Sequence, residues 1–412
     1  MGAEQPKFIA NRYEVLDMVG QGGMGVVYHA WDRLTQHEVA LKSVTIAPDN
    51  LLFKSVPSDD NPLIALANEF RTLAGLRHPH IISVLDYGFD AARKPFFTMR
   101  YLQDAQNILQ TASRINVYSK VTLILPVLSA LDYLHKRNIL HRDLKPGNVL
   151  VTAEHGIQVL DFGLSTTLDR AAGQSGTLWY MAPEVLRGHD ASPQSDLYSV
   201  GVLLHEILTG LKPFETFDLT ALIDNILNTQ PDLASIEDLD DIGYLLSPIV
   251  GRLLSKDPTD RYNSAAAAER AICDALDIPP PEEDDHIRES YLQAATFVGR
   301  TAELGTLNAA LTAAQSGQGA FYLIAGESGV GKSRLLDELR VRALVAGVRV
   351  VRGQALESGG LPFEVWRNPA RQLILSTPEL SDRDASILKD IVPDIDRLLG
   401  RTVPAAPQLS GS

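Results

Sequence analysis

The sequence is almost without cysteine: Cys273 is the only one among 412 residues. A single thiol excludes any disulfide within the chain, which is consistent with a reducing cytoplasm. Because Cys273 falls in a helical-looking stretch, 265–276, we interpret it as a buried structural thiol rather than a reactive one. The N-terminus lacks the charged start and apolar core of a signal peptide, and we find no run of about 18 apolar residues. We therefore expect no membrane-spanning segment.

Positive charge is also in short supply. Lysine and arginine number 37 against 51 acidic residues, which gives a net charge of -14. Proteins that bind nucleic acid or anionic membranes in general need basic patches, so we expect neither partner for this chain. The length, together with 45% hydrophobic residues, indicates a soluble globular protein of two to three domains.

The hydrophobic pattern divides the first two-thirds of the chain into two parts. Apolar and polar residues alternate over 13–44, which predicts a small β-sheet, and 62–76 has helical spacing. Short β-branched and aromatic runs return over 81–102. A long apolar-periodic helix is predicted over 118–136, and the pattern after Pro183 is mostly helical. This order indicates a β-rich lobe with one helix, followed by a larger helical lobe.

Proline and acidic residues dominate the segment 278–290, which reads IPPPEEDDHIRES. Such a composition predicts an extended, solvated linker. Beyond it, 320–325 has the pattern of a buried strand, 335–345 of a helix and 348–352 of another strand. Strand, helix and strand in this order predict a parallel sheet.

A glycine cluster stands at the start of the chain. Residues 20–27 fit G-x-G-x-x-G-x-V, and glycines let the backbone approach phosphates without interference from a Cβ atom. Alone this signal is weak, since dinucleotide-binding folds use the same spacing before a helix. Here Val26, Val27 and Tyr28 favour a strand, which suits a hairpin that covers phosphates. The strand 39–42 (VALK) then ends in a lysine.

Three further motifs follow in order. They are 141–148 (HRDLKPGN), 161–163 (DFG) and 182–184 (APE). Together with the glycine loop and VALK, these motifs form a set of five. Their order and spacing are those of residues that act together in phosphoryl transfer. Residues from about 11 to 275 thereby resemble a Hanks-type (eukaryotic-like) protein kinase domain, and Lys145 and Thr177 resemble its serine/threonine branch.

The resemblance implies a role for each matching residue. Lys42 would hold the α- and β-phosphates of ATP, with Glu69 as its partner on the helix. Asp143 would accept or orient the proton of the substrate hydroxyl, and Lys145 would neutralise charge on the phosphoryl group. The implied Mg²⁺ ligands are Asn148 and Asp161, and the implied nucleotide-binding residues are Gly20, Gly22, Gly25, Val27, Ala40, Lys42, Met99 and Leu150.

The resemblance also implies structural and regulatory features. Leu73, Val84, His141 and Phe162 match a stacked spine with Asp196 beneath it, and Glu184 should pair with Arg261. Arg142 precedes the catalytic aspartate, and such kinases often need a phosphate on the activation loop. Thr177 matches the substrate pocket. This leaves Ser175, Thr166 and Thr167 as candidate autophosphorylation sites.

A second nucleotide site is predicted at 326–333, which satisfies G-x-x-x-x-G-K-[ST] between a strand and a helix. Gly326, Gly331 and the helix N-terminus would cradle phosphates, Lys332 would reach the β/γ-phosphates, and Ser333 would ligate Mg²⁺. The motif at 297–300 (FVGR) resembles the opening of STAND/AAA-like ATPases, in which Val298 and Gly299 approach the base or ribose. We find no Walker B strand, so we expect an incomplete ATPase domain, and the sequence leaves open whether this site hydrolyses nucleotide.

The sequence thus predicts an α+β bilobal protein-kinase fold followed by a partial α/β P-loop NTPase domain. The expected ranges are 1–275 for the kinase domain (N-lobe about 11–102, C-lobe about 103–275), 276–295 for an acidic, proline-rich linker and 296–412 for the P-loop domain. The predicted function is transfer of the ATP γ-phosphate to Ser/Thr of protein substrates in a bacterial cytoplasmic signalling protein. The alternatives are a pseudokinase scaffold and a nucleotide-driven oligomeric switch that self-associates.

Overall fold

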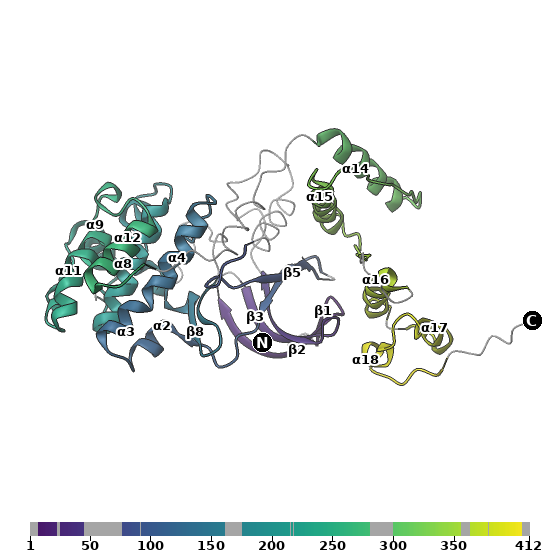
Figure 1. Ribbon diagram of the computed structural model, residues 1–412, viewed down its shortest axis with the longest axis horizontal. Helices are drawn as coiled ribbons and strands as arrows, with labels where there is room; N and C mark the ends of the chain where they lie inside the picture. Colours follow the sequence, from purple (N-terminus) through teal and green to yellow (C-terminus); the bar gives the residue numbers. More distant parts are fainter. Residues whose placement is uncertain are drawn as a thin grey trace, which may run out of the picture.

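A computed structural model describes residues 7–22, 25–44, 76–90, 92–160, 175–214, 216, 218–280, 300–355, 363–377 and 379–405. Figure 1 shows three bodies along the long axis of the molecule: a helical lobe, a sheet and a third group of helices. The expected helix over 62–76 and the expected linker over 278–290 fall largely outside the described residues. Leu76 and 278–280 are the parts of them that are described.

The N-lobe is built on one antiparallel sheet with the order β1-β2-β3-β4-β6-β5. Its strands are β1 (Phe8–Ile9), β2 (Tyr13–Gly22), β3 (Gly25–Asp32), β4 (His37–Val44), β5 (Val84–Phe89) and β6 (Pro95–Arg100). The alternating pattern over 13–44 and the short runs over 81–102 are therefore confirmed as strands. One side of the sheet buries Tyr13, Leu41 and Phe96, and Tyr13 meets Phe96 edge to face at 5.6 Å between ring centroids.

The C-lobe is mostly helical. Its helices are α2 (Ile108–Ala112), α3 (Val117–Thr122), α4 (Ile124–His135), α6 (Ser175–Leu178), α7 (Pro183–Leu186), α8 (Pro193–Thr209), α9 (Leu219–Asn228), α10 (Ala234–Glu237), α11 (Asp241–Leu253) and α12 (Ala265–Leu276). A small antiparallel sheet of β7 (Gln106–Asn107), β8 (Val149–Thr152) and β9 (Gly156–Val159) lies beside them. The helix expected over 118–136 is present as α3 and α4, with Leu123 between them.

Helix α4 is the buried centre of this lobe. By length and composition alone, the stretch Val117–His135 would suffice to cross a membrane. Eight of the twelve α4 residues are buried, and they belong to the same core cluster as the apolar residues of α8. The apolar character of this stretch is therefore explained by its place in a protein core.

The third group of helices follows the linker. It comprises α14 (Thr301–Gln315), α15 (Lys332–Val345), α16 (Glu364–Leu375), α17 (Asp382–Leu388) and α18 (Ile395–Leu399). The predicted helix over 335–345 is confirmed within α15. The strands predicted over 320–325 and 348–352 are wrong, because both segments are irregular in the structure. Phe321 and Leu323 are 90% and 82% exposed. A strand forms only when neighbouring strands satisfy its backbone groups, and no described strand lies beside these segments.

Candidate phosphotransfer and nucleotide sites

The glycine loop is a tight hairpin between β2 and β3, in which Gly22 pairs with Gly25. Gly25 has a φ of +150°, and a Cβ atom there would lie 2.0 Å from the carbonyl oxygen of Ser43. Only glycine fits at this position, because it lets β3 pass directly against β4. The backbone of the hairpin at Gly25 is therefore not covered by a Cβ atom.

Lys42 lies on β4, next to β3 in the sheet, where it pairs with Val27. Its side chain is buried at 4% exposure, and Nζ lies 6.0 Å from the ring centroid of Phe97. A lysine at the solvated edge of a sheet would be exposed, so this one is directed into the lobe. Among the predicted apolar nucleotide-binding residues, Ala40 pairs with Met99 across β4 and β6.

The apolar residues predicted to contact adenine come from both lobes. Ala40 and Met99 from the N-lobe sheet belong to the main core cluster, and Val27 and Leu150 are partly buried against it. Leu150 lies on β8 of the C-lobe. Four side chains that are up to 123 positions apart in the sequence therefore belong to, or pack against, one apolar cluster that extends through both lobes.

Asp143 lies in the loop between α4 and β8. Its Oδ2 atom is 2.9 Å from Lys145 Nζ and accepts a hydrogen bond of 3.0 Å from Asn148 Nδ2, which also donates to the Asp143 carbonyl at 2.7 Å. Lys145 Nζ donates in turn to Thr177 Oγ1 at 3.0 Å. The other carboxylate oxygen, Asp143 Oδ1, is buried and has no hydrogen-bond partner among the described residues.

The loop that carries Asp143 is fixed from below by Asp196 of α8. Asp196 accepts hydrogen bonds from the backbone N–H groups of His141 (2.9 Å) and Arg142 (2.8 Å), and from His135 Nε2 (2.8 Å). Burial alone would raise the pKa of Asp196, but these interactions outweigh it and lower the pKa below its ordinary value. Asp196 therefore stays ionised and holds the loop that carries Asp143.

The end of β9 lies beside Asn148. The Leu160 N–H group donates to the Asn148 carbonyl at 2.9 Å, so the residue before Asp161 is next to Asn148. Residues 80–82, on the N-lobe side, form backbone hydrogen bonds with β9. The Val159 N–H donates to the His80 carbonyl, and the Ile82 N–H donates to the Val159 carbonyl. Asp161, Glu69, Leu73, Phe162, Ser165, Thr166 and Thr167 lie outside the described residues, as does the side chain of Ser175.

The predicted pair between Glu184 and Arg261 is confirmed. Both Arg261 Nη atoms lie 2.8 Å from the two carboxylate oxygens of Glu184, and both residues are buried. Ser195 Oγ donates to the same carboxylate at 2.7 Å. Burial raises the pKa of Glu184, but Arg261 and Ser195 lower it by more. Removing one partner of such a pair costs about 3–5 kcal/mol.

Some functional geometry was not found by sequence reasoning. His135, which supports Asp196, carries no motif, and a histidine at a helix end is usually structural. A second example is Tyr180, whose hydroxyl donates to Glu206, which in turn pairs with Lys212 at 3.1 Å. Tyr180 and Glu206 lie 26 positions apart, and Glu206 and Lys212 lie 6 apart. Only the packing of α8 against the segment after Thr177 shows that they meet.

The second predicted site has the expected loop and helix. Gly329 and Gly331 have φ values of +81° and +93°, and α15 begins directly at Lys332. Lys332 Nζ donates to the carbonyls of Gly326 (2.8 Å) and Glu327 (2.7 Å), so its ammonium group lies over the loop. Ser333 is exposed in the first turn of the helix. The geometry fits an anion, because a helix N-terminus and a lysine face the same loop.

A cavity of about 360 Å³ adjoins this loop. Its lining includes Arg300, Leu307, Tyr322, Gly331 and Lys332. Arg300 is fixed there by Glu303 at 2.8 Å and by a hydrogen bond to the Val330 carbonyl. The cavity combines an apolar wall with a few charged groups, as small-molecule sites commonly do.

Comparisons with known proteins agree with this geometry. Residues 13–272 match the protein kinase domain family, and the chain belongs to that family. Residues 296–410 match the AAA ATPase domain. The resemblance to serine/threonine kinases and to P-loop ATPases that the motifs indicated is therefore confirmed, as is the bilobal kinase fold.

Bacterial protein kinases are among the curated relatives. A probable serine/threonine-protein kinase of Streptomyces coelicolor is 32% identical over 67% of this chain and 42% of its own length. The serine/threonine-protein kinase pkn3 of Myxococcus xanthus is 34% identical over 63% of this chain and 49% of its own. The chain thus spans less than half the length of these relatives. The crystal structure of the Mycobacterium tuberculosis PknI kinase domain shares the fold, with a TM-score of 0.50 and 24% identity over 67% of this chain and all of that one.

Proposed function

We propose that this protein is an ATP-dependent serine/threonine protein kinase that transfers the γ-phosphate of ATP to protein substrates. The observation that carries the proposal is the state of Asp143. One carboxylate oxygen is held by Lys145 and Asn148, while Oδ1 is buried and has no described partner. A buried acceptor without a partner is costly, and a substrate hydroxyl would satisfy it.

The proposed mechanism assigns a task to each residue. Asp143 Oδ1 accepts the proton of the attacking Ser or Thr hydroxyl, whose oxygen bonds to the γ-phosphorus as the bond to the leaving ADP oxygen breaks. Lys145, which bridges Asp143 and Thr177, neutralises charge on the transferring group. Lys42 holds the α- and β-phosphates, and Glu69 is its proposed partner.

Mg²⁺ is the cofactor that this donor set fits. Both described contacts of the Asn148 side chain use its amide nitrogen, so the amide oxygen is the atom that remains for a metal. Asp161 directly follows Leu160, whose N–H donates to the Asn148 carbonyl. An amide oxygen and a carboxylate are the ligands that Mg²⁺ prefers, and the ion would bring the phosphates into place. Ser333 would be the corresponding hydroxyl ligand at the P-loop site.

The remaining assignments follow from the sequence. The kinase domain spans 1–275, 276–295 is a linker, and 296–412 is a P-loop module that binds a second nucleotide. We place the protein in the cytoplasm of a bacterium, where it phosphorylates itself on Ser175, Thr166 or Thr167. Self-association through the P-loop module, as in the alternative of an oligomeric switch, would appear as ATP-dependent assembly that is lost in Lys332→Ala.

A radiolabel assay with [γ-³²P]ATP tests the proposal. We expect Asp143→Asn to reduce autophosphorylation by ~100- to 10,000-fold, the range that a general base contributes. Asp277→Asn is the matched control, because Asp277 is an exposed helix cap with a φ of +53° that asparagine also tolerates. Lys332→Ala should retain phosphotransfer.

Two outcomes would contradict the proposal. Activity in Asp143→Asn equal to that of the control would exclude Asp143 as the base, and absence of phosphotransfer in the unmodified protein would favour the pseudokinase scaffold. Loss of phosphotransfer in Lys332→Ala alone would move the reaction to the P-loop site.

A further inference from the structure

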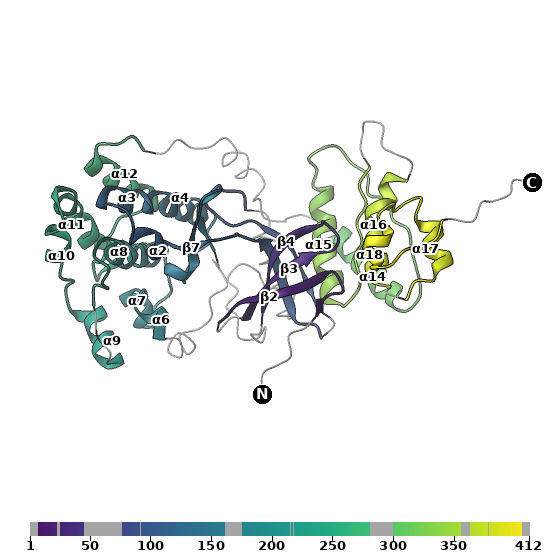
Figure 2. The ribbon, with the colours of Figure 1, turned by 90° about the horizontal axis from the view of Figure 1, so that it is seen from below.

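Helix α15 lies against the kinase N-lobe although it belongs to the P-loop module. Figures 1 and 2 both place it beside the N-lobe sheet, on the side away from the helical lobe. Arg340 of α15 forms an ion pair of 2.8 Å with Asp86 of β5, and its guanidinium lies 4.6 Å from the ring centroid of Tyr87. Arg340 therefore makes an ion pair and a cation–π contact with two neighbouring residues of one strand.

The same face of α15 is apolar. Val341 and Val345 are 0% and 5% exposed, and they belong to the main core cluster of the kinase rather than to a cluster of their own module. The guanidinium of Arg93, in the β5–β6 turn, donates to the Val345 carbonyl at the end of the helix. The burial of two valines adds apolar stabilisation to the ion pair, so this contact is more than a surface ion pair.

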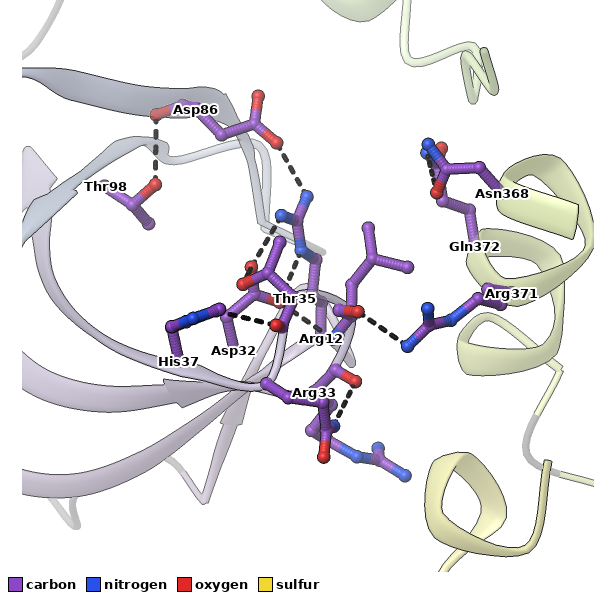
Figure 3. A network of polar contacts seen from close by, with 12 residues as sticks. Arg12, Asp32, Arg33, Thr35, His37, Asp86, Thr98, Asn368, Arg371 and Gln372 are labelled. Atoms are coloured by element: carbon purple, nitrogen blue, oxygen red, sulfur yellow. Dashed lines mark hydrogen bonds and ion pairs between the residues drawn. The ribbon is translucent and has the colours of Figure 1, made fainter. Parts of the chain in front are cut away.

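A second contact joins the N-lobe to α16–α18. Leu34, in the β3–β4 turn, is buried in the apolar cluster that contains Ile374, Leu375 and Leu398. Arg371 of α16, labelled in Figure 3, donates to the Leu34 carbonyl at 2.8 Å. Arg33 donates to the Leu398 carbonyl. The two contacts use different elements of the module, so together they fix its orientation on the lobe.

Asp86 connects the interface to the sheet itself. Besides Arg340, it pairs with Arg12 at 2.6 Å, and Arg12 forms a two-pronged pair with Asp32 (Figure 3). The pKa of Arg340 is raised: burial lowers it, but Asp86 and Tyr87 raise it by more. The cation is therefore permanent, and its carboxylate partner is held in place by Arg12, which is itself fixed to Asp32 of β3.

Helix α15 also begins at the P-loop lysine. Its 14 residues rise about 20 Å, from Lys332 at the phosphate loop to Val345 at the N-lobe. In the structure Lys332 bonds to the Gly326 and Glu327 carbonyls. A bound phosphate would compete for this ammonium group and for the N–H groups of the first turn, and so would shift the start of a rigid helix.

We propose that α15 couples the P-loop to the kinase N-lobe, so that nucleotide bound at 326–333 alters how the module docks on β5. Linkage is reciprocal, so docking on the lobe also changes the affinity of the P-loop for nucleotide. The proposal rests on the proposed phosphate-binding role of the P-loop, and it does not require phosphotransfer by the kinase domain.

Hydrogen exchange of the full chain tests the docking. Arg340→Glu should increase the exchange rate of peptides covering 84–89 and 338–345 by about tenfold, because it places two carboxylates together. Arg340→Gln should give a smaller increase in the same peptides. Arg352→Glu is the matched control: Arg352 is 64% exposed and pairs only with Asp337 of its own module among the described residues. Unchanged exchange at 84–89 in Arg340→Glu would exclude the interface.

The coupling is tested in a Lys42→Met background, which removes the proposed ATP contact in the kinase domain. MgATP should change exchange at 84–89 at least threefold, and Lys42→Met/Lys332→Ala should abolish this change. If MgATP protects 326–333 but leaves 84–89 unaltered, the module docks without coupling and the proposal fails. Neither assay measures phosphotransfer, so failure here is distinct from an inactive kinase domain.

Discussion

Arg142 has a φ of +63°, a left-handed conformation that costs a residue other than glycine about 1–2 kcal/mol. It persists because Asp196 accepts hydrogen bonds from the N–H groups of both His141 and Arg142. The strain turns the chain immediately before Asp143 and leaves Oδ1 of that residue unpaired among the described residues. Strained backbone at such a position is typical of a functional loop. Helix α8 thus supports the proposed catalytic loop through the single carboxylate of Asp196.

Glu269 of α12 is a residue whose ionisation opposes folding. Burial, and then the charge of Asp132 on α4, raise its pKa to about 7, and its Oε1 atom is buried without a described partner. Below pH about 4.5 the carboxyl is protonated in both folded and unfolded chains. As the pH rises towards 7 the unfolded chain loses this proton first, so the free energy of unfolding falls.

We therefore expect Glu269→Gln to stabilise the protein at pH 8. After discounting for solvent screening at this half-buried position, the gain should be about 1–2 kcal/mol, and it should vanish near pH 4.5. Urea denaturation at several pH values measures it. Glu154→Gln, at an exposed turn, is the control and should change nothing. A gain that does not depend on pH would show that charge is not its cause.

At the scale of elements, the sequence predicts those structures that depend on residues close together in the chain. The glycine hairpin, the loop 141–148 and the P-loop helix are each specified within about ten residues, because turn geometry and helix starts depend on nearby side chains. The segments 320–325 and 348–352 are also strand-like by composition, yet they are irregular here. Their conformation depends on neighbouring strands, and no local pattern carries that information.

The same distinction applies to the candidate site. Lys42, Asp143 and Asn148 could be assigned because each stands in a motif. Arg340 and Asp86 could not, since they lie 254 positions apart and neither belongs to a motif. Whether Arg340 and Asp86 come into contact depends on how the surfaces of two modules pack, and not on the spacing of residues along the sequence.

Gly25 provides a prediction about an element. Gly25→Ala places a Cβ atom 2.0 Å from the Ser43 carbonyl at a φ of +150°, so β3 must move away from β4. We expect a loss of about 1–3 kcal/mol in the free energy of unfolding and a raised KM for ATP. Gly20→Ala is the matched control for stability, because nothing lies within 4 Å of its Cβ position. Equal unfolding free energies for the two variants would contradict the packing of the hairpin.

At the scale of the whole molecule, apolar side chains are buried unevenly. The kinase lobes share one large cluster that begins at Ala40, and the buried α15 residues Val341 and Val345 also belong to it. In the described part of the P-loop module, the buried cluster that joins α14 and α15 consists of Leu304, Leu307 and Leu335, and Phe321 and Leu323 beside the P-loop are exposed. Because local stability follows buried apolar contacts, the module should open far more often than the lobes.

Hydrogen exchange of the native chain measures this difference. We expect amides at 320–325 to exchange at least a hundredfold faster than those at 200–207, which lie within the buried helix α8. α15 should be intermediate, because its last two turns are covered by the N-lobe while its first turn faces the P-loop. MgATP should slow exchange at 326–333 by mass action without protecting 320–325 equally. Equal protection of 320–325 and 200–207 would mean that a partner segment covers the apolar run, and that the P-loop module is as stable as the kinase lobes.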